Sequence, residues 1–196
     1  MRTFKTISRI TLLGMFLGFC ISANAQTKFS TKNNISLSVS GTSTMHDWVM
    51  KSGVGDCTAT FVEDAKGNLI DLTTLNFTVS SKSLKSGKDG MDKNAYKALK
   101  TDKAPNITAT LKSAEVSTKD NKNYTIKAII KLTIAGKTLD TELVTQAKRI
   151  NDNSYAIKGE KQISMKDFGM EPPSFMLGAV KTGNDVVLNF DAVLNR

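Results

Sequence analysis

The chain has 196 residues, of which 40% are hydrophobic, 7% aromatic and 23% charged, with a formal net charge of +9. One histidine and two cysteines are too few for a His or Cys metal cluster, and no basic stripe interleaved with aromatic rings argues for a nucleic-acid partner. The excess of lysine predicts a solvated surface or, as the alternative, a peripheral contact with anionic membrane head groups.

The first 25 residues have the three parts of a secretory signal peptide. Three basic and no acidic residues precede position 10, residues 10–21 are apolar, and small residues lead up to Ala25. The apolar stretch is too short to span a bilayer as a helix. We therefore expect a signal peptide over residues 1–25, a single mature domain over residues 26–196, and a periplasmic or secreted location. Lipidation at Cys20 is the alternative, which the bulky Phe19 before it disfavours.

In the first half of the mature chain, apolar and polar residues alternate with the period of a β-strand. The pattern predicts strands over residues 35–40, 57–62, 75–79 and 107–111, and a turn at residues 64–68. Between the last two strands, apolar residues at helical spacing predict one short helix over residues 90–100. Cys57 lies in the second of these strands, where it is interpreted as a small buried core residue rather than a reactive thiol.

The second half of the chain is more regular. Residues 124–134 alternate Ile and Leu with Lys and Thr, Gly136 begins a tight turn, and residues 139–147 return as the other strand of a hairpin. Residues 155–165 and 186–194 continue the pattern. Eight strands with one apolar face each predict an all-β antiparallel fold, and the length of the later strands favours a barrel over a sandwich. Because the outward faces are charged, the apolar face points inward, and an interior of this size is either filled or holds one small ligand.

Candidates for catalysis are scarce. His46 is the only histidine, and Asp47 follows it directly. Adjacent residues on an extended chain point to opposite faces, so the pair is poorly placed as a base and the group that orients it. We expect a structural hydrogen bond at the end of a strand, and we predict that the protein is not an enzyme.

Several segments, weak singly, resemble the YceI-like family of exported lipid-binding proteins, in the form common in Bacteroidetes-type bacteria. They occur in the family's order and include GTSTMHDW at residues 41–48, VSSKSLKSG at 79–87, APNI at 104–107, LTIAGKT at 132–138 and MKDFGM at 165–170. The resemblance implies an elongated, lipocalin-like antiparallel barrel with a long apolar cavity. It further implies that the cavity holds a polyisoprenoid chain, such as the tail of a quinone or of a polyprenyl phosphate, and that no other cofactor is present.

We predict that the lipid contacts inward strand positions and the segment before the last strand. These residues are Leu37, Val39, Leu75, Phe77, Val79, Ile107, Leu111, Ile130, Leu132, Leu143, Phe168, Phe175 and Met176. Each of them fits plain core packing equally well. The leading hypothesis is an exported, non-catalytic protein that holds an isoprenoid or similar lipid for transport or storage. The alternatives are a structural or interaction protein of the cell envelope with a filled barrel and, third, an enzyme acting on a bound lipid through His46 and Asp47.

Overall fold

The computed structural model describes residues 25–175 and 178–196, so residues 1–24 of the predicted signal peptide lie outside it. The strands of the described residues are β1 (Ala25–Lys32), β2 (Ile35–Ser43), β3 (Trp48–Ser52), β4 (Asp56–Glu63), β5 (Leu69–Ser80), β6 (Asn106–Thr118), β7 (Asn123–Ile134), β8 (Lys137–Asn151), β9 (Ser154–Ser164), β10 (Ser174–Phe175) and β11 (Val180–Asn195). Its helices are α1 (Asp89–Ala98) and the short 3₁₀ turns η1 (Ser81–Ser83) and η2 (Lys166–Phe168).

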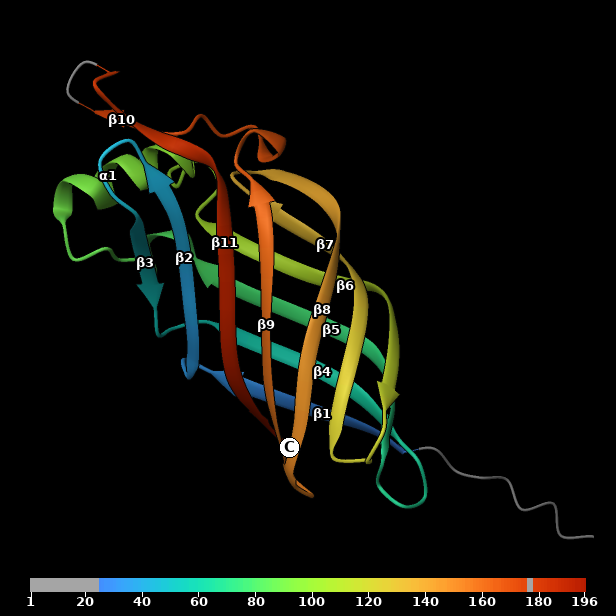
Figure 1. The fold of residues 1–196 in the computed structure, drawn as a ribbon. Helices are drawn as coiled ribbons and strands as arrows, with labels where there is room; N and C mark the ends of the chain where they lie inside the picture. The colour runs from blue at the N-terminus through green and yellow to red at the C-terminus, as the bar shows by residue number, and fades with distance from the viewer. Residues whose placement is uncertain (1–24, 176–177) are drawn as a thin grey trace, which may run out of the picture.

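The strands form a closed antiparallel ring in the order β1-β4-β5-β6-β7-β8-β9-β11 (Figure 1). The ring closes where Ser30 of β1 pairs with Asn195 of β11. Strands β2 and β3 continue β1 and β4 beyond two breaks, and the amide of Asn33 donates to the carbonyl of Gly55 at 2.8 Å across these breaks. The predicted eight-stranded antiparallel barrel with one short helix is therefore confirmed.

The central hairpin shows why the sequence closes in this way. Along β7 every second residue from Tyr124 to Ile134 is buried, and the residues between them are exposed or half-buried. Ala135 and Gly136 turn the chain into β8 with φ of 52° and 82°, the left-handed backbone that a two-residue hairpin turn of this kind requires. The apolar faces of such hairpins together form the inside of the barrel.

The two ends of the barrel differ. Helix α1 and strand β10 lie at one end, and the described chain begins and ends at the other (Figure 1). Buried residues form one group around Phe29, Phe61 and Tyr155 and a second that includes Ile134 and Phe168. No helix within the described residues is long and apolar enough to cross a membrane.

Candidate ligand-binding cavity

The inside of the barrel contains two adjoining chambers. The mouth chamber, next to α1, has a volume of about 300 Å³, and the deep chamber has about 150 Å³. The first volume is at the lower end of the ~300–1,000 Å³ typical of small-molecule sites. The chambers share the lining residues Val39, Leu84, Ile107, Ile134 and Leu188, so they adjoin along the barrel. The interior of this barrel is therefore not filled by its own side chains.

Methionines and one helix surround the mouth chamber. Its methionines are Met45, Met50, Met91, Met165 and Met170, and α1 adds Ala95 and Ala98. Methionine side chains are unbranched and flexible, so such a wall adapts to irregular apolar ligands. At the rim, Met45 is 68% exposed.

The segment with the predicted strand-end histidine forms part of this rim. The Ser43 hydroxyl donates to the carbonyl of His46 at 2.7 Å, and His46 Nδ1 lies 2.8 Å from the carbonyl oxygen of Asp47. The contact is with the backbone of Asp47 and not with its carboxylate, so the hydrogen bond fixes the local conformation of the segment, as expected at the end of a strand. Trp48 donates from Nε1 to the carbonyl of Thr42 at 3.0 Å. Its ring lies over Gly41, where a Cβ would come within 2.5 Å of the indole.

The deep chamber is lined by the inward positions of the ring strands, with Phe61, Leu72 and Leu194 among them. Cys57 also lines it and is buried, which confirms the interpretation of this residue as part of the core. Burial raises the pKa of the Cys57 thiol to about 11, so the thiol is neutral at physiological pH.

An aromatic layer closes the far end of the cavity. The rings of Phe29, Phe61 and Tyr155 contact one another with centroids 5.1–5.3 Å apart, and Tyr124 lies 6.3 Å from Tyr155. The pairs that include Tyr155 are edge-to-face, a favourable arrangement for aromatic rings, and the Phe29–Phe61 pair is tilted by 39°. Phe61 of this layer lines the deep chamber, so the chamber ends against these rings on this side.

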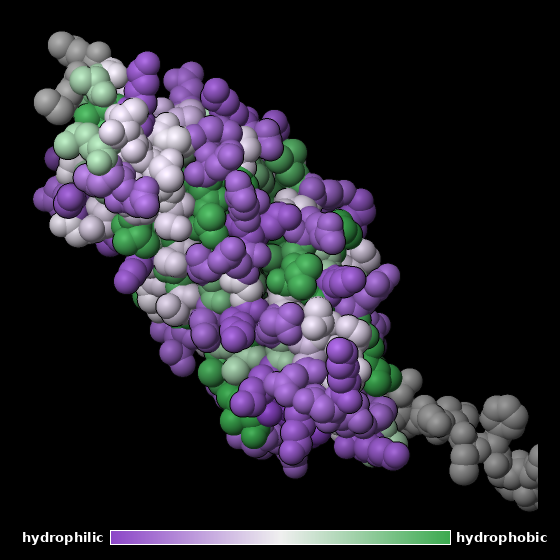
Figure 2. Space-filling model, viewed as in Figure 1, coloured by the Kyte–Doolittle hydropathy of each residue, from purple (hydrophilic) through white to green (hydrophobic). Residues whose placement is uncertain are grey.

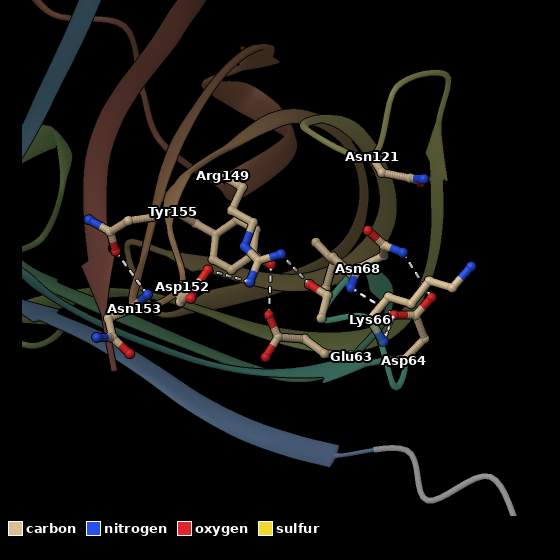
Figure 3. Close-up of polar contacts among 12 residues, drawn as sticks. Glu63, Asp64, Lys66, Asn68, Asn121, Arg149, Asp152, Asn153 and Tyr155 are labelled. Carbon is tan, nitrogen blue, oxygen red and sulfur yellow. Dashed lines mark hydrogen bonds and ion pairs between the residues drawn. The ribbon is translucent and has the colours of Figure 1, made fainter.

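A polar layer lies around the aromatic one (Figure 3). The Tyr155 hydroxyl donates to Glu63 at 2.8 Å, and Glu63 is only 6% exposed. Burial, and then the bond to Glu63, raise the pKa of Tyr155 well above its ordinary value. Arg149 donates to the carbonyl of Gly67 at 2.7 Å and to Asp152 at 3.0 Å (Figure 3). These bonds join the loops at this end, so they hold the closed end together.

The structure places most of the predicted contacts on the cavity wall. Those that line it are Leu37, Val39, Leu75, Phe77, Val79, Ile107, Ile130, Leu132, Leu143 and Phe175. Leu111 packs against the core without lining the cavity, Phe168 is buried in the core beside the mouth chamber, and Met176 lies outside the described residues. The sequence analysis missed the contribution of α1, the methionines other than Met176, and one charged residue of the deep chamber, Lys161.

The chemistry of the lining is apolar. Among residues 25–175 and 178–196, no group of three or more His, Cys, Asp or Glu side chains is placed to hold a metal ion. An antiparallel ring of eight strands around an apolar cavity, with a helix at its mouth, defines a β-barrel protein of lipocalin-like architecture.

Comparison with known families gives the assignment within this class. The chain belongs to the YceI-like domain family, whose model matches residues 21–194. The predicted family is thereby confirmed, whereas the Bacteroidetes-type subgroup stays a prediction. No curated protein matches the chain.

Solved structures share the fold. Burkholderia cenocepacia BcnA is similar with a TM-score of 0.63 at 14% identity, covering 81% of this chain and 95% of that one. A polyisoprenoid-binding domain from Saccharophagus degradans, implicated in plant cell wall breakdown, gives 0.59 at 12% identity over 87% and 99%. The Campylobacter jejuni YceI protein gives 0.53 at 21% identity over 72% and 81%. At these identities the likeness establishes the fold alone.

Proposed function

We propose that this protein is an exported, non-catalytic carrier or store that holds a polyisoprenoid or a similar long apolar lipid inside its barrel. The observation that supports this proposal is the pair of adjoining chambers inside the barrel, with their largely apolar wall. A neighbour of the same fold is described as polyisoprenoid-binding, which agrees with it. The cavity disfavours the filled-barrel alternative.

The physical basis is the burial of hydrocarbon. Moving apolar surface out of water is worth roughly 25 cal/mol per Å², and a prenyl chain presents a branched methyl group in every unit. No directional chemistry is needed to hold such a chain. We assign no covalent step to the site, because its wall is apolar and the ring of His46 at the rim contacts a backbone carbonyl.

Organic extraction of the purified full-length protein, followed by mass spectrometry, tests the proposal. We expect recovery of a lipid with a prenyl or comparably long apolar chain in near-stoichiometric amount. Repeated recovery of no lipid, together with no binding of farnesol added to the purified protein, would overturn it.

A cavity-filling variant sharpens the test. Ala128 of β7 is buried and lines the deep chamber, so Ala128→Phe is expected to place a ring in that chamber and shorten the longest chain that binds. Ala156→Phe on β9 is the control, because Ala156 lies between the inward residues Tyr155 and Ile157 and faces outward. Affinities for isoprenols of increasing length are compared by calorimetry. If Ala128→Phe leaves the length dependence of the wild-type protein unchanged, the tail does not occupy the deep chamber.

A further inference from the structure

The segment between β5 and β6 carries most of the net positive charge of the barrel. Residues 81–105 contain seven lysines and three aspartates, a net charge of +4. Residues 26–80 and 106–196 together contain 17 basic and 15 acidic residues, a net charge of only +2. Because residues 81–105 include η1 and α1, this excess charge lies at the mouth of the barrel and not along its wall (Figure 1).

The lysines of this segment are exposed, and few of them are neutralised. Ion pairs join Lys82 to Asp102 at 3.3 Å and Lys85 to Asp92 at 3.5 Å. Lys100 donates to the carbonyl of Gly169 at 2.8 Å, which attaches the segment to the end of η2. The lysines whose ammonium groups make no ion pair or hydrogen bond to residues 25–175 or 178–196 are Lys88, Lys93, Lys97 and Lys103.

The other charges at the mouth do not cancel this excess. Exposed charged residues in or next to the remaining turns at this end are equal in number, with Asp47, Asp167, Glu171 and Asp185 against Lys51, Lys137, Lys166 and Lys181. The net charge of the mouth is therefore that of residues 81–105.

Apolar side chains are exposed beside these lysines. Met45 is 68% exposed, the most of any large hydrophobic side chain in the described residues, and it lines the mouth chamber together with Lys88 and Met91. Phe175 and Val180 of the same chamber are half-buried. Figure 2 shows hydrophobic and strongly hydrophilic residues next to one another at the end that carries β10. The mouth thus combines an apolar rim with a surplus of cations.

We propose that residues 81–105, with Met45 at the rim, form a surface that docks to an anionic lipid bilayer, so that the mouth chamber opens toward the lipid. Each lysine close to an anionic membrane adds about fivefold to the affinity. Lysine is a flexible point charge without the fixed fork of arginine, and methionine adapts to irregular apolar surroundings. Both properties suit a fluid layer of head groups better than the defined surface of an acidic protein. This inference rests on the proposed function only for its purpose, which is to bring the chamber to its lipid.

Sedimentation with lipid vesicles tests the docking surface. Residues 26–196 are used, because they hold the whole barrel except the first residue of β1, and because the basic and apolar residues before them would themselves bind lipid. We expect at least tenfold tighter binding to vesicles with one-third phosphatidylglycerol than to pure phosphatidylcholine. The difference is expected to disappear at about 1 M salt, where charges are screened within ~3 Å.

A triple variant locates the surface. Lys93→Gln, Lys97→Gln and Lys103→Gln remove three exposed charges that do not line the chamber, so together they are expected to weaken binding to anionic vesicles at least tenfold. The control removes the same number of charges from the outside of the wall, with Lys127→Gln, Lys148→Gln and Lys158→Gln. It is expected to bind within about twofold of wild type. Both triple variants are expected to keep their affinity for farnesol in solution, which shows that the barrel is intact.

A fluorescent label reports which end meets the membrane. Cys57, the only cysteine of residues 26–196, is buried, so a thiol-reactive dye labels an introduced cysteine instead. A dye on Met45→Cys is expected to shift to the blue when anionic vesicles are added, and a dye on Lys119→Cys, in the turn between β6 and β7 at the far end, is not.

The docking surface is refuted if wild-type protein does not prefer anionic vesicles, if both triple variants lose binding equally, or if both dyes shift alike. Each of these results leaves the proposed function standing when farnesol still binds in solution. Binding to anionic vesicles through the mouth without any binding of farnesol would support the docking surface and count against the proposed function.

Discussion

Gly159 of β9 lies beneath the ring of Phe190, its register partner on β11. A Cβ at Gly159 would lie 2.4 Å from Cζ of that ring and 3.2 Å from the carbonyl oxygen of Val144. Phe190 lines the deep chamber, so the missing side chain allows the ring to lie close against the wall. The pairing of β8 with β9 also ends at this glycine.

We therefore expect Gly159→Ala to destabilise the fold by about 1–3 kcal/mol, because the added methyl group must displace a packed ring or the backbone. Denaturant unfolding of the delipidated protein measures the change. Gly53→Ala is the control, since a Cβ at Gly53 meets nothing within 4 Å. Equal effects of the two variants would show that the contact with Phe190 is unimportant.

Cys57 makes the free energy of unfolding depend on pH in the alkaline range. Its folded-state pKa of about 11 lies above its ordinary value of 9.0, because burial disfavours the thiolate. The resulting stabilisation is complete below pH 9 and is lost as the pH rises to about 11, where the unfolded chain ionises first. We expect the wild-type protein to lose about 2 kcal/mol more than Cys57→Ala over this range, as measured by denaturant unfolding at each pH. Parallel losses in the two proteins would contradict this assignment.

At the scale of elements, helix α1 is attached to the segment before it through the hydroxyl of Tyr96, which donates to the carbonyls of Lys82 and Leu84, and through one buried carboxylate. Asp92 is 5% exposed and accepts hydrogen bonds from the hydroxyl of Ser86 at 2.7 Å and from its amide at 2.8 Å. The hydroxyl of Ser86 and, less strongly, its amide and Lys85 lower the pKa of Asp92. Because α1 lines the mouth chamber, these contacts hold one wall of that chamber in place.

Asp92→Asn is expected to loosen α1 and to release bound farnesol about fivefold faster, the equivalent of roughly 1 kcal/mol. Asp89→Asn, an exposed change in the same first turn, serves as the control. Release is followed by stopped-flow fluorescence of Trp48, which lines the same chamber. Unaltered release from Asp92→Asn would show that the helix does not limit exchange. Acid is expected to speed release in the same way, because the pKa of Asp92 is lowered in the folded protein. The hydrogen bonds to its carboxylate are fully present above the ordinary Asp pKa of 3.8, and they weaken as the pH falls through the lower pKa of the folded state.

The sequence predicted strands where inward residues are large and apolar, and it missed them elsewhere. Strand β7 was predicted at almost its full length because its inward positions are mainly Ile and Leu. Strand β1 was missed because its inward positions include Thr27 and Thr31, which look polar in a pattern although both are buried. Strand β6 was predicted too short, since a register shift between Leu111 and Ser113 changes the phase of the alternation.

The residues that line the cavity were predictable where the strands that carry them were. Inward apolar residues such as Leu37 and Ile130 were found because alternation determines their face. Lys161 was not, because a charge within an alternating strand is normally assigned to the outer face. Most of the mouth chamber was also missed, since α1, the segment around Met45 and the segment around Met170 meet there only through the fold.

At the scale of the whole molecule, the position of β1 bears on export. The described structure begins with β1 at Ala25, and Gln26 is already paired with Val62 of β4. Cleavage after Ala25 would therefore remove only the first residue of the strand, and Gln26 to Lys32 would stay paired with β4. We expect amino-terminal sequencing of protein from the periplasm or medium to begin at Gln26. Recovery of the uncleaved chain in the cytoplasm alone would contradict the proposed export.

The pairing of β1 with β11, through Ser30 and Asn195, also determines when the barrel is able to close. The first strand finds one of its neighbours only after the last strand exists, and contacts between residues so far apart in the chain form late and slowly. A nascent chain therefore stays open, with the apolar side chains of the future barrel interior accessible to chaperones. The proposed lipid would therefore be able to enter only after the last strand has been made, because before that moment there is no enclosed space to hold it.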